Sequence, residues 1–257
     1  MPGSSLGPRP AGSGAGELLR DEKVQPAGSF AGTLHRPLSH CLRSDWMSRS
    51  TVDAPSVKVA DAAHDIESIF RTRWSPRAFA DRPVEPEKLR RMLEAARWTM
   101  SSYNEQPWRY VVATQEDADA YDALLNCLTK GNREWAHLAP VLMMSFVKTT
   151  FSHNEEDNRC AEHDLGAASA ALTFQATSMG LYVHQMAGIR ADVVRSTYDV
   201  PDDVEPMAAL AVGYLGSPDQ LPEGRRAGER RPRSRAPLSD FVFGSDGWGE
   251  PAALVAP

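Results

Sequence analysis

Two short, arginine-rich stretches lie far apart in the chain and carry the side chains best suited to binding chemistry. Arg73, Ser75 and Arg77 occur in RTRWSPRAF. Arg233 and Arg235 occur two apart in PRSRAP, where an extended backbone would point both side chains to one face. Guanidinium groups, a serine hydroxyl and loop amides hold a terminal phosphate by charge-assisted, often bidentate hydrogen bonds. Both stretches are therefore candidates for binding a phosphate group.

A plainer interpretation holds for the other arginines of the tail. Arg225, Arg226, Arg230 and Arg231 lie in a segment that is rich in Pro and Arg and poor in apolar residues. We expect these side chains to be solvated and the segment from Ser217 onward to wrap over a surface.

A third polar segment, MSSYNEQPWRY, contains Ser101, Ser102 and Asn104. Hydroxyl and amide groups supply donors and acceptors suited to a polyhydroxyl chain or to the edge of a heterocycle. The alternative is a turn in which these three side chains cap backbone groups. Taken alone, the segment favours the turn.

Composition limits the class of protein. The chain has 257 residues, of which 42% are hydrophobic and 24% charged, as expected for a globular protein with one core. No apolar run of about 18 residues and no signal-like start occur, so neither a membrane span nor secretion is predicted, and a cytoplasmic location is the default expectation. The net charge of −6 argues against a general nucleic-acid binder. Three scattered cysteines without CxxC spacing argue against a disulfide framework or a zinc site.

Apolar periodicity predicts a mixture of helices and strands. The expected helices cover 66–70, 86–96, 121–128, 162–179 and 191–198, and the expected strands cover 108–113, 140–147, 181–186 and 207–216. The longest helix is dense in Ala, Ser and Gly, and small residues let helices approach closely. We therefore expect it at the centre of the fold or across a subunit interface.

The first part of the chain has a different composition. Residues 1–56 are rich in Gly, Pro and Ser and have no sustained apolar pattern, which predicts a disordered N-terminal extension before an ordered domain over 57–257. This extension includes GSGAG, but no strand before it or helix after it supports a dinucleotide-binding loop.

Four features in this order resemble the FMN-dependent nitroreductase family: RTRWSPRAF, SSYNEQPWRY, the small-residue helix followed by HQMAG, and PRSRAP. The resemblance extends from about Ile66 to Gly249. It implies an α+β fold, a three-layer α/β/α sandwich with a mostly antiparallel central sheet. It also implies a homodimer with FMN at the subunit interface and a C-terminal tail that extends over the partner subunit.

The resemblance implies the cofactor-binding residues as well. Arg73 and Ser75 would hold the FMN phosphate, flanked by Trp74, with Arg233 and Arg235 closing on it from the tail. Arg77 would reach the polar edge of the flavin ring. The other implied positions are Ser101, Ser102 and Asn104 from the other subunit, Asn132 at the ring, and the backbone of Gln185, Met186, Ala187 and Gly188 near N5.

The activity implied by the resemblance is that of an NAD(P)H-dependent FMN oxidoreductase. It would reduce nitroaromatics, quinones or similar electron-poor acceptors by ping-pong hydride transfer, with Arg77 as the catalytic residue that stabilises charge on the reduced ring. No metal is required. The alternatives are a flavin or ene reductase, a dehalogenase, or an FMN-binding sensor or store without turnover.

Two departures from the family pattern bear on the site. Met100 stands where many members have a proline before the serines, and Trp135 stands where some have a second cation near the ring. Arg77 would then be the sole cation at that edge. Acceptor choice would depend on loops around residues 128–135 and 149–160.

Overall fold

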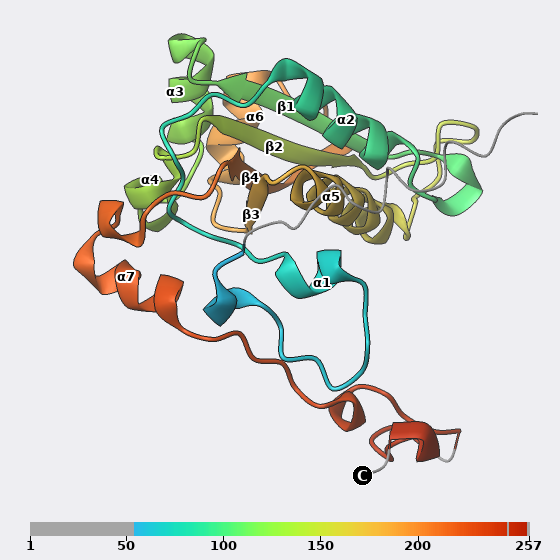
Figure 1. Cartoon of the computed structure of the whole chain (residues 1–257). Helices are drawn as coiled ribbons and strands as arrows, with labels where there is room; N and C mark the ends of the chain where they lie inside the picture. The colour runs from blue at the N-terminus through green and yellow to red at the C-terminus, as the bar shows by residue number, and fades with distance from the viewer. Residues whose placement is uncertain (1–53, 246, 256–257) are drawn as a thin grey trace, which may run out of the picture. The chain divides into compact units, whose positions relative to one another are not determined.

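A four-stranded sheet forms the centre of the protein (Figure 1). The computed structural model describes residues 54–245 and 247–255, which lie in one compact unit of the chain. The strands are β1 (Trp108–Thr114), β2 (Val141–Lys148), β3 (Tyr182–Met186) and β4 (Val204–Gly213), in the order β1-β2-β4-β3. Every neighbouring pair is antiparallel, and each strand lies within three residues of its predicted position.

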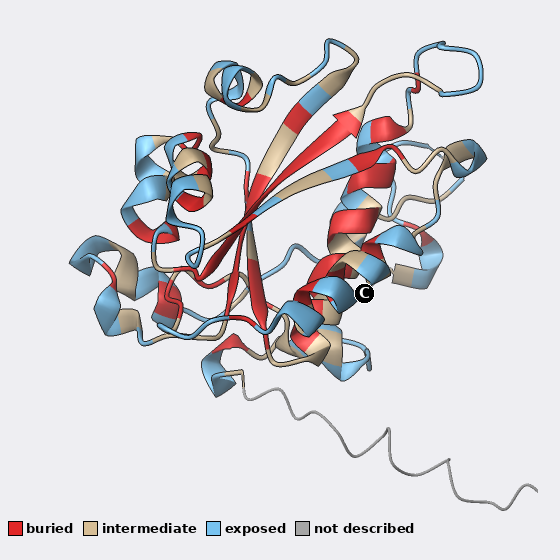
Figure 2. Ribbon diagram, turned by 90° about the horizontal axis from the view of Figure 1, so that it is seen from above, coloured by how far each residue is buried: buried red, intermediate tan, exposed pale blue. Residues whose placement is uncertain are grey.

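The central strand β2 is buried along almost its whole length. Leu142 and Met144 face one core, whereas Val141 and Met143 face the other, as period-2 side-chain alternation requires. Figure 2 shows the buried residues concentrated in the strands and on the helix faces turned toward them. Helices on both sides of the sheet explain why β2 reads as a continuous apolar run.

Helices cover both faces of the sheet. α2 (Pro86–Arg97) and α5 (Ala161–Ser178) pack on the face that includes Val141, and α5 buries small residues such as Ala168 there. α3 (Ala118–Asn126) and α6 (Ala191–Tyr198) contribute to the opposite core. The predicted α+β class with an antiparallel sheet between helical layers is confirmed.

The register between β2 and β4 shifts at Ser145 and Phe146. The irregularity accommodates Pro206, which has no N–H for the ladder. The Ser145 hydroxyl donates to the carbonyl of Ala208 at 2.9 Å and accepts from its N–H at 3.2 Å. The side chain therefore satisfies backbone groups where the ladder is interrupted.

Three helices differ from expectation. α1 is only five residues long (Ser68–Thr72), and Ile66 and Phe70, expected on a buried stripe, are 41% and 44% exposed. α4 (Lys130–Ala136) occupies a segment expected to be a loop, and α7 (Glu223–Arg230) was not predicted. Their sequences, KGNREWA and EGRRAGER, are short and polar, so no apolar periodicity marks them.

Short 3-10 turns complete the described part of the chain: Ser56–Lys58, Ser102–Asn104, Pro218–Gln220, Leu238–Asp240 and Ala253–Val255. No helix within residues 54–245 or 247–255 is long and apolar enough to cross a membrane. The predicted N-terminal extension lies outside the described residues except for residues 54–56.

Candidate functional site

The loop after α1 presents polar side chains on an anchored backbone. Arg73 ends α1 in an extended conformation, and its Nη1 donates to Oγ of Ser75 at 3.2 Å. Arg73, Ser75 and Arg77 are partly exposed, whereas Trp74 and Pro76, which alternate with them, are buried. Apolar and polar residues alternate, so the buried side chains anchor the loop and the polar side chains face solvent.

Arg73 lies near the two arginines from the distant PRSRAP stretch. Burial lowers the pKa of Arg73, and the positive charges of Arg233 and Arg235 lower it further. The pKa of Arg233 is lowered by burial and then by Arg235. We call Arg73, Arg233 and Arg235 the arginine cluster. Among the described residues, none of the three forms an ion pair with a carboxylate.

The tail is tied to the loop through hydrogen bonds to backbone carbonyls. Nη1 of Arg233 donates to the carbonyl of Arg71 at 2.8 Å and to that of Lys58 at 3.1 Å. Arg235 is exposed, and its Nη1 donates to the carbonyl of Ser234. These bonds orient two guanidinium groups without neutralising either charge.

Arg77 has an acidic partner, Glu229, that is not evident from the sequence. Its N–H donates to Oε2 of Glu229 in α7 at 3.2 Å, and its Nη1 lies 3.9 Å from Oε1. The Glu229 side chain is only 2% exposed. The guanidinium also lies over the ring of Trp135, 5.8 Å from its centroid. Arg77 is therefore a paired cation, although its Nε is buried without a partner among the described residues.

The aromatic residues beside Arg77 are deeply packed. Trp135 is fully buried and lies 4.5 Å from the ring of His184, while its Nε1 has no hydrogen-bond partner in the described part of the chain. Burial, followed by the charge of Arg77, lowers the pKa of His184 to about 4, although a hydrogen bond between Nδ1 and the carbonyl of Pro76 opposes the shift. His184 is therefore neutral at pH 7. Trp74 is also buried, and its side chain packs in the core.

The structure brings the predicted ring-binding residues Asn132 and Gly188 together. Asn132 Nδ2 donates to the carbonyl of Gly188 at 3.1 Å, and the N–H and Oγ1 of Thr129 donate to the same carbonyl. A Cβ atom on residue 188 would lie 2.6 Å from Asn132 Nδ2 and 2.8 Å from Thr129 Oγ1. A larger residue at this position would have to displace the Asn132 amide and the Thr129 hydroxyl.

The residues before Gly188 divide between core and surface. Met186 is buried, so its side chain belongs to the core and only its backbone is available to a ligand. Gln185 and Ala187 are exposed. The Gln185 amide donates to the carbonyl of Ser169 and to Oγ1 of Thr173, which joins this end of β3 to α5.

The predicted loop of Ser101, Ser102 and Asn104 lies at the end of α2, and within the described residues no hydrogen bond or ion pair joins it to the arginine cluster. In Figure 1 this end of α2 and α4 lie at opposite sides of the sheet. The N–H of Ser102 donates to Oδ2 of the buried Asp164 at 2.9 Å, and Oγ of Ser101 accepts from Gln106. The capping role considered for Ser101 is therefore observed.

The same loop has an unusual backbone and exposed large side chains. Tyr103, Asn104 and Gln106 have φ near +54°, the left-handed region that non-glycine residues rarely adopt. Trp98 and Met100 are each 77% exposed, and Tyr103 is 83% exposed. A conformation with this strain persists only where the surroundings determine it, which is typical of functional loops.

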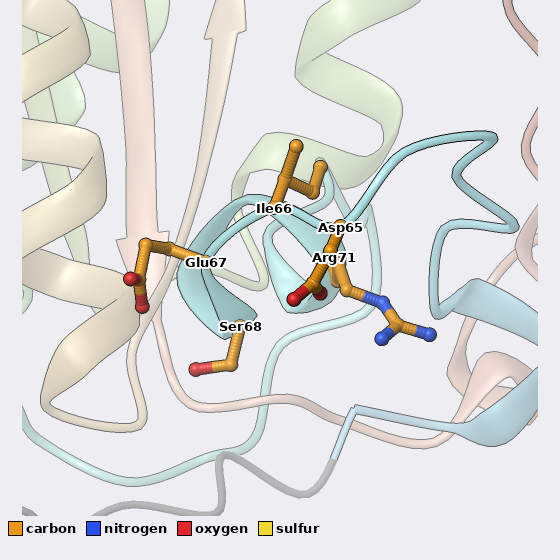
Figure 3. Close-up of a pocket in the computed structure, with 5 residues that line it drawn as sticks. All are labelled: Asp65, Ile66, Glu67, Ser68 and Arg71. Carbon is orange, nitrogen blue, oxygen red and sulfur yellow. The ribbon is translucent and has the colours of Figure 1, made fainter.

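A hollow of about 460 Å³ opens beside α1 and is lined by Asp65, Ile66, Glu67, Ser68 and Arg71 (Figure 3). Two of these side chains are carboxylates, which would repel a phosphate. The hollow contains none of the predicted cofactor-binding residues. It is therefore not the candidate site, although the carbonyl of Arg71 accepts from Arg233.

Comparison with known proteins identifies the family. The sequence matches the family model described as Nitroreductase over residues 70–214. An uncharacterized 15.4 kDa protein of Mycolicibacterium smegmatis is 39% identical over 142 residues, covering 53% of this chain and 92% of that protein. A protein of Xanthomonas oryzae pv. oryzae, provisionally named NADH dehydrogenase/NAD(P)H nitroreductase, is 35% identical over 31% of this chain and 39% of its own length.

The fold agrees with this identification. The crystal structure of an oxidoreductase containing FMN matches with a TM-score of 0.67 at 33% identity, covering 72% of this chain and 93% of that chain. The resemblance inferred from the ordered motifs is confirmed. The chain belongs to the nitroreductase family.

Proposed function

We propose that the protein is an FMN-dependent NAD(P)H oxidoreductase that reduces nitroaromatics, quinones or similar electron-poor acceptors. The related crystal structure contains FMN, and the Xanthomonas relative carries the provisional name of an NAD(P)H nitroreductase. The observation that carries the proposal is the arginine cluster, because three guanidinium groups approach one another without a carboxylate among the described residues.

Like charges brought together in this way need an anion to offset their repulsion. A terminal phosphate carries a charge near −2 and several acceptor oxygens, which suits guanidinium groups and the hydroxyl of Ser75. The site is local, so it is compatible with the net charge of −6 for the whole chain.

Two orphaned donors near Arg77 fit the rest of the cofactor. Buried polar groups are normally hydrogen-bonded, yet Nε of Arg77 and Nε1 of Trp135 lack partners among the described residues. The edge of a flavin ring has carbonyl and ring-nitrogen acceptors for such donors. FMN, when bound, supplies hydride transfer between the nicotinamide and the acceptor.

The chain's own residues would bind the cofactor and orient it. The arginine cluster and Ser75 hold the phosphate, the Asn132–Gly188 contact fixes the backbone at the end of β3, and Arg77 keeps a positive charge at the ring edge. A cation placed there stabilises charge that develops during reduction. Because Glu229 is paired with Arg77, this stabilisation is weaker than that of a free arginine.

We also propose that the functional unit is a homodimer in which the Ser101–Asn104 loop of one chain meets the arginine cluster of the other. Ile66, Phe70, Trp98, Met100 and Tyr103 are large side chains exposed in the single chain. Large apolar side chains that stay exposed in a single chain are candidates for a contact surface. Sedimentation of the FMN-loaded protein as a monomer would contradict this part of the proposal.

The test of function is a visible absorption spectrum of the purified protein, followed by anaerobic addition of NADPH and then NADH. We expect flavin bands that bleach and return when a nitroaromatic or a quinone is added. Bound FMN that stays oxidised with both nucleotides would instead indicate a binding module without turnover. A colourless protein that cannot be reconstituted with FMN would refute the proposal.

A further inference from the structure

Lys58 is a buried lysine just before the region that matches the family model. It is 4% exposed and lies in the 3-10 turn Ser56–Lys58. Its Nζ donates to the carbonyl of Gly228 at 2.9 Å and to that of Arg231 at 2.7 Å, and it lies 4.7 Å from the centroid of the Trp74 ring. A lysine is rarely buried unless its ammonium group is satisfied, so these contacts indicate a defined structural position.

The ammonium of Lys58 holds the end of α7. Gly228 lies in the last turn of this helix and Arg231 is its C-cap residue. Carbonyls at a helix C-terminus lack intrahelical partners, and a cation there also interacts favourably with the helix dipole. Lys58 therefore fixes the point from which the chain continues to Arg233.

The backbone of Lys58 acts on the same segment from the other side. Its carbonyl accepts from Nη1 of Arg233 at 3.1 Å, and the carbonyl of Arg71, which also accepts from that atom, accepts from the N–H of Ala60 as well. One short segment thus contacts the tail backbone, the Arg233 guanidinium and the stretch of chain that leads to Arg73. Lys58 and Arg233 are like charges close together, so these hydrogen bonds hold the tail in place against their repulsion.

We propose that Lys58 is a positioning residue for the arginine cluster, through which the segment 55–60 holds Arg233 against Arg73 for binding of a phosphate monoester. The family match covers residues 70–214, so this segment and Arg233 both lie outside it. Lys58 itself does not touch the phosphate. The identification of the ligand as FMN rests on the proposed function.

The test uses the full chain, freed of bound flavin, and the variant Lys58→Met, which keeps an apolar side chain of similar length but removes the ammonium. FMN and riboflavin are titrated by fluorescence, because riboflavin has the ring and lacks the phosphate. We expect Lys58→Met to weaken FMN binding about tenfold and to leave riboflavin binding within about twofold. Equal weakening of both ligands, or unchanged FMN binding, would overturn the inference.

Lys88→Met is the matched control. Lys88 also donates to a backbone carbonyl, that of Met179, and lies 4.9 Å from the centroid of an aromatic ring, that of Tyr214. It joins α2 to the end of α5 and to the residue after β4, and among the described residues it has no hydrogen bond to the arginine cluster. We expect this variant to lower the melting temperature without changing the ratio of FMN to riboflavin affinity.

A double-variant cycle separates positioning from general stability. In an Arg233→Gln background, Lys58→Met should have no further effect on FMN affinity, because the side chain that it positions is absent. Additive losses would overturn the inference. If Lys58→Met does not fold, Lys58→Gln retains a neutral donor and should show a smaller, phosphate-specific loss; an unchanged ratio of FMN to riboflavin affinity would again overturn it.

Inorganic phosphate distinguishes this inference from the proposed function. A wild-type protein that binds phosphate but not FMN would refute the flavin assignment, and a tenfold weaker phosphate affinity in Lys58→Met would still support the positioning role. A wild-type protein that binds neither would refute both.

Discussion

The two predicted parts of the cofactor site are built on opposite principles. At the arginine cluster, positive charges converge and stay unpaired by acids of the described chain, and orphaned donors lie near Arg77. At the Ser101–Asn104 loop, polar contacts close within the chain, through Asp164 and Gln106, while large side chains remain exposed. These features support the proposed anionic ligand at the first region and the proposed partner surface at the second.

The largest expected effect follows from a substitution in the arginine cluster. Arg73→Gln should weaken FMN binding roughly 10- to 100-fold, because charge-assisted hydrogen bonds contribute about 1.5–3 kcal/mol. Riboflavin affinity should change little, as measured by fluorescence titration. Arg230→Gln is the control, since Arg230 is 61% exposed and pairs with Asp219 on the surface. Equal loss in both variants would mean that the cluster has no special role.

The next prediction concerns a substitution that removes a hydrogen bond of the Ser101–Asn104 loop. Asp164→Ala removes the acceptor of the Ser102 N–H, and a partly buried donor left unpaired lowers the unfolding free energy by about 1 kcal/mol. Urea denaturation measures this loss. FMN and riboflavin affinities should fall together, unlike in Arg73→Gln. Glu162→Ala, an exposed carboxylate in the same first turn of α5, should be nearly neutral. A change confined to FMN would contradict the contrast between the regions.

The proximity of Arg73 to Arg233 and Arg235 was predictable, because both stretches carry arginines suited to one anion and the order of the motifs resembles the family. The burial of Glu229 and Lys58 was not predictable. EGRRAGER looks like a solvated segment, and Lys58 lies at the edge of a low-complexity region, so only tertiary contacts reveal that both are buried.

The burial of Asp164 could have been predicted from the sequence. It precedes Ala168 and Leu172 at intervals of four, so it continues a buried stripe of the long helix and sits there as a carboxylate. For Ile66 and Phe70 the prediction of burial was wrong, because both are exposed. Their spacing predicted burial, but the single chain offers them no complete covering surface among its described residues, and the sequence does not show whether an apolar stripe faces the same chain or another copy.

Acid should destabilise the folded protein through His184. The pKa of His184 is about 4 in the folded protein, compared with about 6.5 for a histidine in the unfolded chain, so the unfolded chain takes up a proton first as pH falls. The stabilising contribution is complete above about pH 6.5 and is lost between about pH 6.5 and 4, by about 2 kcal/mol at pH 5. Urea denaturation at pH 7, 6 and 5 should show a smaller pH dependence for His184→Gln. His163→Gln, at an 85% exposed side chain, is the control for the loss of a histidine.

The smallest effect sharpens the comparison at Arg77. Glu229→Gln keeps an acceptor for the Arg77 N–H but removes a buried negative charge beside its guanidinium. In the proposed site, a less neutralised cation at the ring edge would stabilise the reduced, negatively charged flavin. The midpoint potential of bound FMN should therefore rise by on the order of 30 mV, equivalent to about 1.4 kcal/mol for two electrons. Glu223→Gln, at an exposed position in the first turn of α7, should leave the potential unchanged. An unchanged or lower potential in Glu229→Gln would show that Arg77 does not act on the ring, because a charge that interacts with the flavin must shift the potential when its partner is removed.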